Sequence, residues 1–228
     1  MQEKFLYLFC FFFCSFAFPT NVIERFIWNT KHIDFEVICE EEDRVMFFKL
    51  IYDTVTELNK GVGGQFLEWK ELSPGEEYSK KRYMSFVLEK NGCGETDAVS
   101  KGGFYVPLST SEKCSMVTNL RNLMASLGFI YTHLRQDRDQ FIIIHYDNIY
   151  NVDKQIYQKC YDCMESTNSA FSVYDYTSIL HFPQYSIYSK NASAPIFTPK
   201  QNNVEMDETW NDKHFTSQDA LIFKAIYG

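Results

Sequence analysis

Hydrophobic and polar residues alternate near the N-terminal end of the chain in the pattern of a strand. Ile33, Phe35 and Val37 are separated by Asp34 and Glu36, so one face of the segment is apolar and the other is charged. A period of two places successive side chains on opposite faces of a half-buried strand. We therefore expect a strand over residues 33–37.

A helical pattern follows this strand. Residues 40–43 are all acidic, which suits the positive end of a helix dipole, and Lys60-Gly61 supplies a stop signal. Between them, apolar residues recur at helical spacing at Val45, Phe48, Ile51, Val55 and Leu58. The pattern predicts an amphipathic helix with these residues on its apolar face.

Three further short apolar or alternating runs predict strands, at residues 66–69, 83–88 and 104–108. Turn-forming Pro, Gly and Asn residues separate them. The first half of the chain therefore reads as α+β.

A second helix is predicted after Cys114. Val117, Leu120, Met124 and Leu127 fall at i, i+3, i+7 and i+10, and Gly128 follows as a stop signal. The helix should therefore end near Leu127.

The chain beyond this helix has less regular patterning. It contains an apolar run at 141–144, a tyrosine-rich loop through Tyr176, and a helical pattern from Ser217 to Tyr227. Ser217 is the predicted N-cap of that final helix. No repeat or linker interrupts the chain, so the simplest organisation is two lobes joined at Gly128, over about residues 22–128 and 129–228.

Composition and charge narrow the possible functions. The 228 residues, 45% of them hydrophobic, can bury one core or two lobes of about 100 residues each. The formal net charge is -8 and the pI is about 5.2, and the clearest basic cluster is Lys80-Lys81-Arg82. A nucleic-acid-binding surface needs more positive charge, so we expect no nucleic-acid partner.

The N-terminal segment has the features of a signal peptide. Lys4 precedes an apolar run over residues 5–18, and Ser15 and Ala17 are small residues suited to a cleavage site after Ala17. A membrane-spanning helix needs about 20 apolar residues, so we expect no stable membrane anchor. We expect residues 1–17 to be a signal peptide and the protein to be secreted and extracellular; a buried N-terminal strand or helix is the alternative.

The cysteines fit an oxidising compartment but leave one unpaired. Without residues 1–17 the chain keeps five of them: Cys39, Cys93, Cys114, Cys160 and Cys163. At least one thiol is then free or pairs between chains. The C-x-x-C pair at 160–163 has zinc-knuckle spacing, but without a second pair a local disulfide or free thiols fit better. Asn191-Ala192-Ser193 is a glycosylation sequon, which predicts a glycoprotein.

Residues 121–139, RNLMASLGFIYTHLRQDRD, resemble the active-site segment of the astacin family of metzincin zinc peptidases. That segment has the pattern H-E-x-x-H-x-x-G-x-x-H-E-x-x-R-x-D-R-D. Here its glycine and its charged tail are present, at Gly128, Arg135, Asp137, Arg138 and Asp139.

Other parts of the chain extend this similarity over about residues 23–228. Residues 173–183 resemble the family's turn beneath the metal, with Ser178, Leu180 and His181 in it, and residues 215–228 resemble its closing helix. The resemblance implies an α+β, two-lobed, metzincin-like fold. Its N-terminal lobe would hold a mixed twisted sheet and two long helices, and its C-terminal lobe would be irregular with a final helix. The resemblance also implies a disulfide between Cys93 and Cys114.

The groups that perform the family's chemistry are replaced in this chain. The three zinc-ligand positions are Arg121, Ala125 and Tyr131, and the general-base position is Asn122. Three supporting positions also differ: Leu180 replaces the methionine of the turn, Phe182 the tyrosine that can approach the metal, and Thr132 the glutamate that receives the mature N-terminus.

This set of substitutions removes the metal site. Two histidines at i and i+4 can share a zinc ion because they lie on one face of a helix, and the neighbouring glutamate then reaches the zinc-bound water. A guanidinium offers zinc no lone pair and repels it. We expect no bound zinc, and no peptide hydrolysis by the family's mechanism.

The residues that survive have structural interpretations. His133 and His181 are not ligands in the family, so we expect them to be hydrogen-bonded structural histidines. The charged tail, residues 135–139, should form ion pairs and turn hydrogen bonds, and Tyr131 should be a core or cleft-wall aromatic residue.

The leading hypothesis is a secreted pseudoprotease that binds an extracellular protein or peptide in its cleft. Residues 102–108 resemble the strand that aligns substrate in the family, but Pro107 has no main-chain N–H to offer a bound peptide. One alternative is an active metalloendopeptidase with an atypical or displaced zinc site, although the chain contains no H-x-x-x-H pair. Another is an assembly component linked through the odd cysteine.

Overall fold

The structure, a computed structural model, describes most of the chain beyond the first residues. The described residues are 18–23, 26–80, 82–93, 105–112, 114–161, 163–166, 168–185, 189–209 and 213–228. The predicted signal peptide, residues 1–17, and part of the predicted substrate-aligning strand, residues 102–104, lie outside them.

The described part of the chain combines strands, three α-helices and short 3-10 helices. The strands are β1 Phe18–Ile23, β2 His32–Ile38, β3 Glu68–Glu71, β4 Met84–Glu89, β5 Tyr105–Ser109, β6 Ile142–Ile144, β7 Cys163–Ser166 and β8 Phe197–Pro199. The α-helices are α1 Arg44–Val62, α2 Met116–Ser126 and α3 Ser217–Tyr227. The 3-10 helices are η2 Glu41–Asp43, η3 Glu76–Ser79, η4 Thr132–Leu134, η5 Arg138–Gln140, η6 Tyr146–Asn148, η7 Asn151–Tyr157 and η8 Ser169–Phe171.

A four-stranded sheet with the order β3-β2-β4-β5 forms the framework of the upper lobe. All its described strand pairs are parallel, where the resemblance implied a mixed sheet. The predicted strands at 33–37, 83–88 and 104–108 correspond to β2, β4 and β5. The strand predicted at 66–69 begins two residues later, because Leu67 is buried in the core as the chain enters β3.

Helix α1 buries a face that overlaps the predicted one. Ile51 and Leu58 are buried as predicted, and Phe48 and Val55 are partly buried against the same core. The side chains that it buries are Phe47, Ile51, Thr54, Leu58 and Val62. Val45, predicted to be apolar core, is 86% exposed. The predicted set and the buried set share Ile51 and Leu58. The buried set also contains Thr54, whose hydroxyl donates to the Leu50 carbonyl at 2.8 Å. That internal hydrogen bond allows Thr54 to occupy an apolar environment.

The end of α1 also differs from the prediction. The helix continues through Lys60-Gly61 and ends at Val62, with Gly63 in the left-handed conformation as its C-cap. A side chain at Gly61 would place its Cβ 2.6 Å from the ring of Phe215. Gly61 is therefore a packing glycine, and Gly63 is the stop signal.

Helices α2 and α3 complete the upper lobe. Helix α1 packs against both of them, and α2 packs against β5. Helix α2 ends where predicted: Gly128 has a φ of 97°, and a Cβ there would approach the backbone of Phe26 and Ile27 to 3.1 Å. The N-cap of α3 is Thr216, not Ser217, because Thr216 and Asp219 form a capping box.

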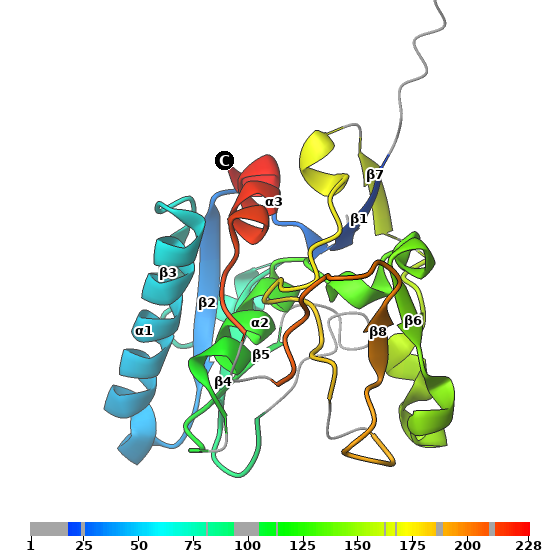
Figure 1. Cartoon of the computed structure of the whole chain (residues 1–228). Helices are drawn as coiled ribbons and strands as arrows, with labels where there is room; N and C mark the ends of the chain where they lie inside the picture. The colour runs from blue at the N-terminus through cyan, green and yellow to red at the C-terminus, as the bar shows by residue number, and fades with distance from the viewer. Residues whose placement is uncertain are drawn as a thin grey trace, which may run out of the picture.

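The hydrophobic core is divided into clusters. The largest packs the sheet against the three α-helices, and a second includes Ile142 of β6 and Phe197 of β8. In Figure 1, α1 and the four-stranded sheet lie on one side of the molecule and β6 and β8 on the other. Strand β1 pairs with β7, so the N-terminal strand lies against the lower lobe, and the bridge from Val22 to Phe129 continues that contact. Among the described helices, we find none with the length and hydrophobicity needed to cross a membrane.

Candidate functional site

Three of the replaced positions, Arg121, Tyr131 and Phe182, come together in the structure. Arg121 and Ala125 come from α2, and both are buried, Arg121 completely. The positive φ of Gly128 turns the chain at the end of α2 so that Tyr131 approaches Arg121. The guanidinium carbon of Arg121 lies 5.5 Å from the centre of the Tyr131 ring and 5.8 Å from that of Phe182. The ring centres of Tyr131 and Phe182 are themselves 4.6 Å apart.

Asn122, at the general-base position, fastens α2 to the sheet. Its side-chain amide donates to the carbonyl of Pro107 at 2.9 Å and to that of Cys93 at 3.4 Å. Asn122 is fully buried, and a glutamate at this position would present an acceptor to the same carbonyls. The residue therefore has a structural role that a carboxylate cannot perform.

Two more polar residues of α2 extend this contact along β5. Asn119 exchanges two hydrogen bonds with the backbone of Ser109, at 2.8 and 3.2 Å, and the Ser126 hydroxyl donates to the carbonyl of Tyr105 at 3.1 Å. With Asn122 they occupy positions i, i+3 and i+7 of α2 and serve alternate residues of β5. Sequence reasoning did not identify this polar row, although its helical spacing is visible in the sequence.

The turn at residues 178–182 is held by a buried carboxylate that the sequence reasoning also missed. Asp219 of α3 accepts hydrogen bonds from the Ser178 hydroxyl at 2.5 Å, the Ile179 amide at 3.0 Å and the Thr216 amide at 3.1 Å. Burial raises the pKa of Asp219 to about 6, although these hydrogen bonds act against the shift. The capping-box spacing of Thr216 and Asp219 was the available signal.

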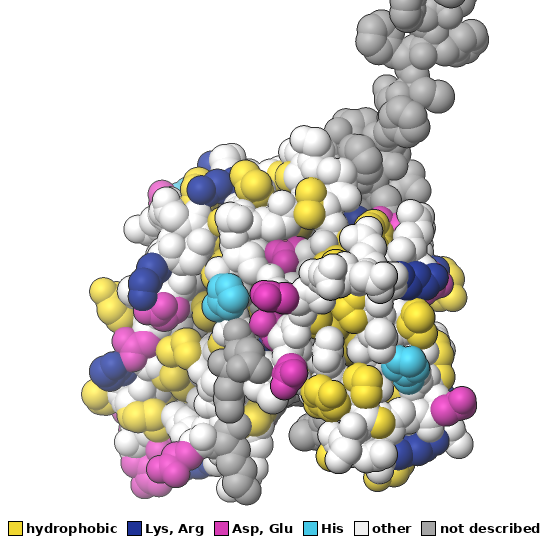
Figure 2. Space-filling model, viewed as in Figure 1, with side chains coloured by type: hydrophobic (Ala, Val, Ile, Leu, Met, Phe, Trp, Pro, Cys, Tyr) yellow, Lys and Arg dark blue, Asp and Glu magenta, His cyan; other side chains and the backbone are white. Residues whose placement is uncertain are grey.

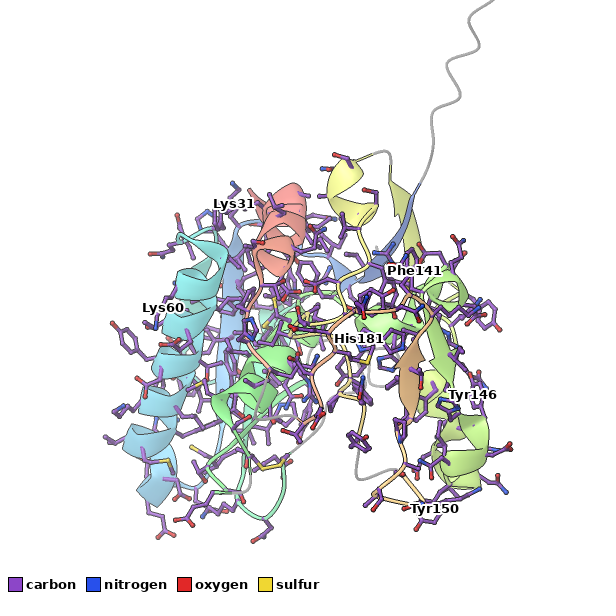
Figure 3. All side chains as sticks on the ribbon, in the orientation of Figure 1. Lys31, Lys60, Phe141, Tyr146, Tyr150 and His181 are labelled. Atoms are coloured by element: carbon purple, nitrogen blue, oxygen red, sulfur yellow. A yellow bond between two sulfur atoms is a disulfide. The ribbon has the colours of Figure 1, made fainter. Side chains whose placement is uncertain are left out.

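His181 is a hydrogen-bonded structural histidine, as predicted. Its Nδ1–H donates to the carbonyl of Phe182 at 2.6 Å, so its Nε2 accepts from the hydroxyl of Tyr174 at 2.9 Å. Burial lowers the pKa of His181 to about 3, which keeps the ring neutral. Figure 3 places it in the middle of the molecule.

His133 differs from His181 in being held mainly by ring contacts. Its ring centre lies 4.3 Å from that of Phe182 and 5.8 Å from that of His181. Burial, with smaller contributions from His181 and Arg138, lowers the pKa of His133 well below its usual value. Both histidines are therefore neutral packing residues at neutral pH.

The charged tail forms the predicted ion pairs. Arg135 makes two parallel hydrogen bonds to the carboxylate of Asp137, each 2.9 Å, and a third to the carbonyl of Val173 at 2.8 Å. Arg138 donates to the carbonyl of His133 at 2.9 Å and pairs with Asp139 at 3.2 Å. These contacts fix the segment after Tyr131 within the lower lobe.

The side chains at the zinc-ligand positions do not fit zinc. A guanidinium and a methyl group provide no lone pair, which leaves the phenol of Tyr131 as the single possible donor. Both ring nitrogens of His181 are engaged in hydrogen bonds. Within the described ranges of the chain, no three His, Cys, Asp or Glu side chains are grouped as metal ligands.

Two disulfides are formed among the described cysteines. Cys93 is joined to Cys114, as the resemblance implied, which connects the chain after β4 to the start of α2. Cys160 is joined to Cys163, so the C-x-x-C pair is a local disulfide. Cys39 is a half-buried free thiol. The sequon residue Asn191 is exposed, and its side-chain oxygen accepts from the amide of Ser193 at 3.0 Å.

Comparison with known proteins supports the family that the sequence resembles. The family model for astacin, a peptidase family, matches residues 26–228. The astacin-like metalloprotease toxin 1 of Loxosceles intermedia is 36% identical over 122 residues, which is 53% of this chain and 45% of that protein. The embryonic protein UVS.2 of Xenopus laevis is 28% identical over 122 residues, 54% of this chain and 23% of that protein. The chain therefore spans less than half the length of these relatives.

A solved structure shares the fold. It is the high choriolytic enzyme 1 of Oryzias latipes, a hatching enzyme zinc-protease, with a TM-score of 0.62 and 19% identity over 88% of this chain and 92% of that one. The match over residues 26–228 shows that the chain belongs to the astacin family.

Proposed function

We propose that this protein is a secreted astacin-family domain without peptidase activity, which acts by binding an extracellular protein or peptide. The observation that carries the proposal is the position of Arg121. Its guanidinium is fully buried and lies over the rings of Tyr131 and Phe182, at the positions where the family holds its metal. Without zinc, the pKa of a water molecule at the site is not lowered from ~15.7 toward ~7. The amide of Asn122 cannot serve as a general base.

The contacts of β5 support binding through side chains and not by strand addition. The backbone carbonyls of Tyr105, Pro107 and Ser109 already accept hydrogen bonds from α2. Pro107 has no N–H to donate to an extended peptide. Figure 2 shows Asp and Glu side chains along the middle of the face that it displays, so a partner approaching this face would meet carboxylates.

The decisive experiment measures zinc and proteolysis on the same purified protein. We expect less than one tenth of an equivalent of zinc by mass spectrometry after dialysis, and no cleavage of casein in zinc-containing buffer. An active astacin-family enzyme purified in the same way is the positive control. Cleavage that is abolished by a chelator and restored by zinc would overturn the proposal.

A double variant separates an active displaced site from contamination. His133 and His181 are the two fully buried histidines among the described residues, so they are the first to test as ligands of a displaced zinc site in this region. If chelator-sensitive cleavage disappears in the variant His133→Phe, His181→Phe, the activity belongs to the chain. If it persists in the folded variant, these two histidines do not hold the metal. Cleavage that then separates from the chain in a further purification step belongs to a contaminating protease, and cleavage that follows the chain overturns the proposal.

Secretion and glycosylation are tested together. The two disulfides support folding in an oxidising compartment. We expect expression in a secretory host to deliver the protein to the medium with a mass that falls on removal of N-linked glycans. The variant Asn191→Gln should have the lower mass without that treatment.

A further inference from the structure

Arg121 lies where two hydrophobic clusters meet. Its neighbours in α2, Leu120 and Leu123, belong to the cluster that packs on the sheet. Phe182 belongs to the lower cluster, and Tyr131 packs against it. One fully buried side chain on the helix that carries part of the upper cluster therefore lies over two rings of the lower lobe.

The chemistry of a guanidinium suits this position. It stays charged at every accessible pH, it is more weakly hydrated than an ammonium group, and its flat surface stacks on aromatic faces. The negative face of an aromatic ring attracts a cation, and the attraction is strongest where water is excluded. An aliphatic side chain of similar length would fill much of the volume but would not attract the rings.

We propose that the Arg121 guanidinium is a permanent internal cation that holds α2 against the lower lobe, in the place where family members hold a metal ion. The cation is covalently attached, so it cannot be removed by a chelator or lost on dilution. This role does not depend on whether the domain is catalytically inactive.

A backbone hydrogen bond connects the two segments that carry Tyr131 and Phe182, and its stability can be measured. The amide of Thr132, next to Tyr131, donates to the carbonyl of Leu180 at 2.9 Å, and Leu180 lies two residues before Phe182. If the guanidinium holds the two ring-bearing segments, its loss should loosen this hydrogen bond in particular. Hydrogen exchange at Thr132 therefore distinguishes a local joint from a general loss of packing.

The test compares Arg121→Met with a matched surface variant, Arg44→Met. The guanidinium carbon of Arg44 lies 5.1 Å from the centre of the Phe48 ring, but its side chain is 38% exposed. We expect Arg121→Met to lower the melting temperature by about 5–10 °C and Arg44→Met by less than about 2 °C. Exchange at Thr132 should accelerate at least ~10-fold in Arg121→Met alone.

Chemical rescue tests the cation itself. The cavity left by Arg121→Ala should take up ethylguanidinium, which should raise the melting temperature of that variant saturably at millimolar concentration. Neutral ethylurea, which has a similar planar shape, should do so much less, and neither should stabilise Arg44→Ala.

Three outcomes would overturn the proposal: an Arg121→Met variant as stable as the wild type, unchanged exchange at Thr132 in that variant, or equal rescue by ethylguanidinium and ethylurea. If Arg121→Ala does not fold, the Met variant decides the matter. A Met variant that fails to fold where Arg121→Lys folds supports the need for a cation.

Discussion

Replacing Asp219 by asparagine should remove part of the pH dependence of stability while leaving the fold intact. Asp219 fixes the turn at Ser178 and Ile179 through hydrogen bonds that an amide can largely reproduce. The asparagine oxygen can accept from the two backbone amides, and its NH2 group can donate to the Ser178 hydroxyl oxygen. Asp219→Ala is the disruptive comparison, since it removes all three bonds.

The sign of the pH effect follows from the raised pKa. The pKa of Asp219 is about 6 in the folded protein, against about 3.9 in an unfolded chain. Between these values the folded state binds more protons than the unfolded state, so protonation stabilises the fold as the pH falls. Protonation of Asp219 should raise the free energy of unfolding by about 1.3 kcal/mol when the pH is lowered from 7 to 5, and by about 2.3 kcal/mol when it is lowered from 7 to 4.

The assay is urea unfolding of the wild type, Asp219→Asn and Asp219→Ala at pH 7 and pH 5. Relative to Asp219→Asn, the wild type should gain about 1–1.5 kcal/mol on going to pH 5. Asp219→Ala should lose about 3–5 kcal/mol at pH 7, because it leaves buried donors without acceptors. Equal pH dependence of the wild type and Asp219→Asn would refute the reasoning, because Asp219 would then not titrate in this range.

Three further predictions concern the histidines, the local disulfide and the metal positions. His181→Phe should reduce the loss of stability between pH 7 and pH 5 by about 2 kcal/mol. The pKa of His181 is about 3 in the folded protein, so this histidine destabilises the fold as the pH falls below ~6.5, its pKa in the unfolded chain. Urea unfolding at both pH values measures the difference. Cys160→Ser should cost only ~2 kcal/mol, since the closed loop is short, and thermal unfolding without reductant tests this. Zinc binding, followed by calorimetry, should appear when all ligand positions and the base position are restored together. The same variant with Asn122 retained should be more stable by ~1–3 kcal/mol, because it keeps the hydrogen bond to Pro107. A folded quadruple variant that binds no zinc would contradict the assignment of the positions. The quadruple variant is Arg121→His, Asn122→Glu, Ala125→His and Tyr131→His.

The fold was predictable where local patterns and the family resemblance agreed. The end of α2 at Gly128 and the disulfide from Cys93 to Cys114 are confirmed. Periodicity predicted only part of the buried face of α1, because it places Ile51 and Leu58 in the core but does not reveal that Thr54 is buried with them. A threonine reads as polar in the sequence, and its hydrogen bond to its own helix is visible only in the structure.

The candidate site was predictable as a set of positions but not as an arrangement. The sequence predicted that Arg121 and Tyr131 occupy ligand positions, and it could not show that the guanidinium of Arg121 lies over the Tyr131 ring. Asn122 was interpreted as a lost base, whereas the structure makes it a donor to Pro107. Such roles depend on which backbone carbonyls lie opposite the helix, and those come from distant parts of the chain.

Gly128 is a position at which membership of the astacin family can be recognised, although the family's reactive groups are replaced in this chain. A residue there must adopt a φ of 97° and must also fit against the backbone of Phe26 and Ile27. Both demands come from the architecture and neither from catalysis, so selection for a folded domain is sufficient to retain this glycine. Substitutions at the reactive positions alone therefore leave the demand on Gly128 unaltered.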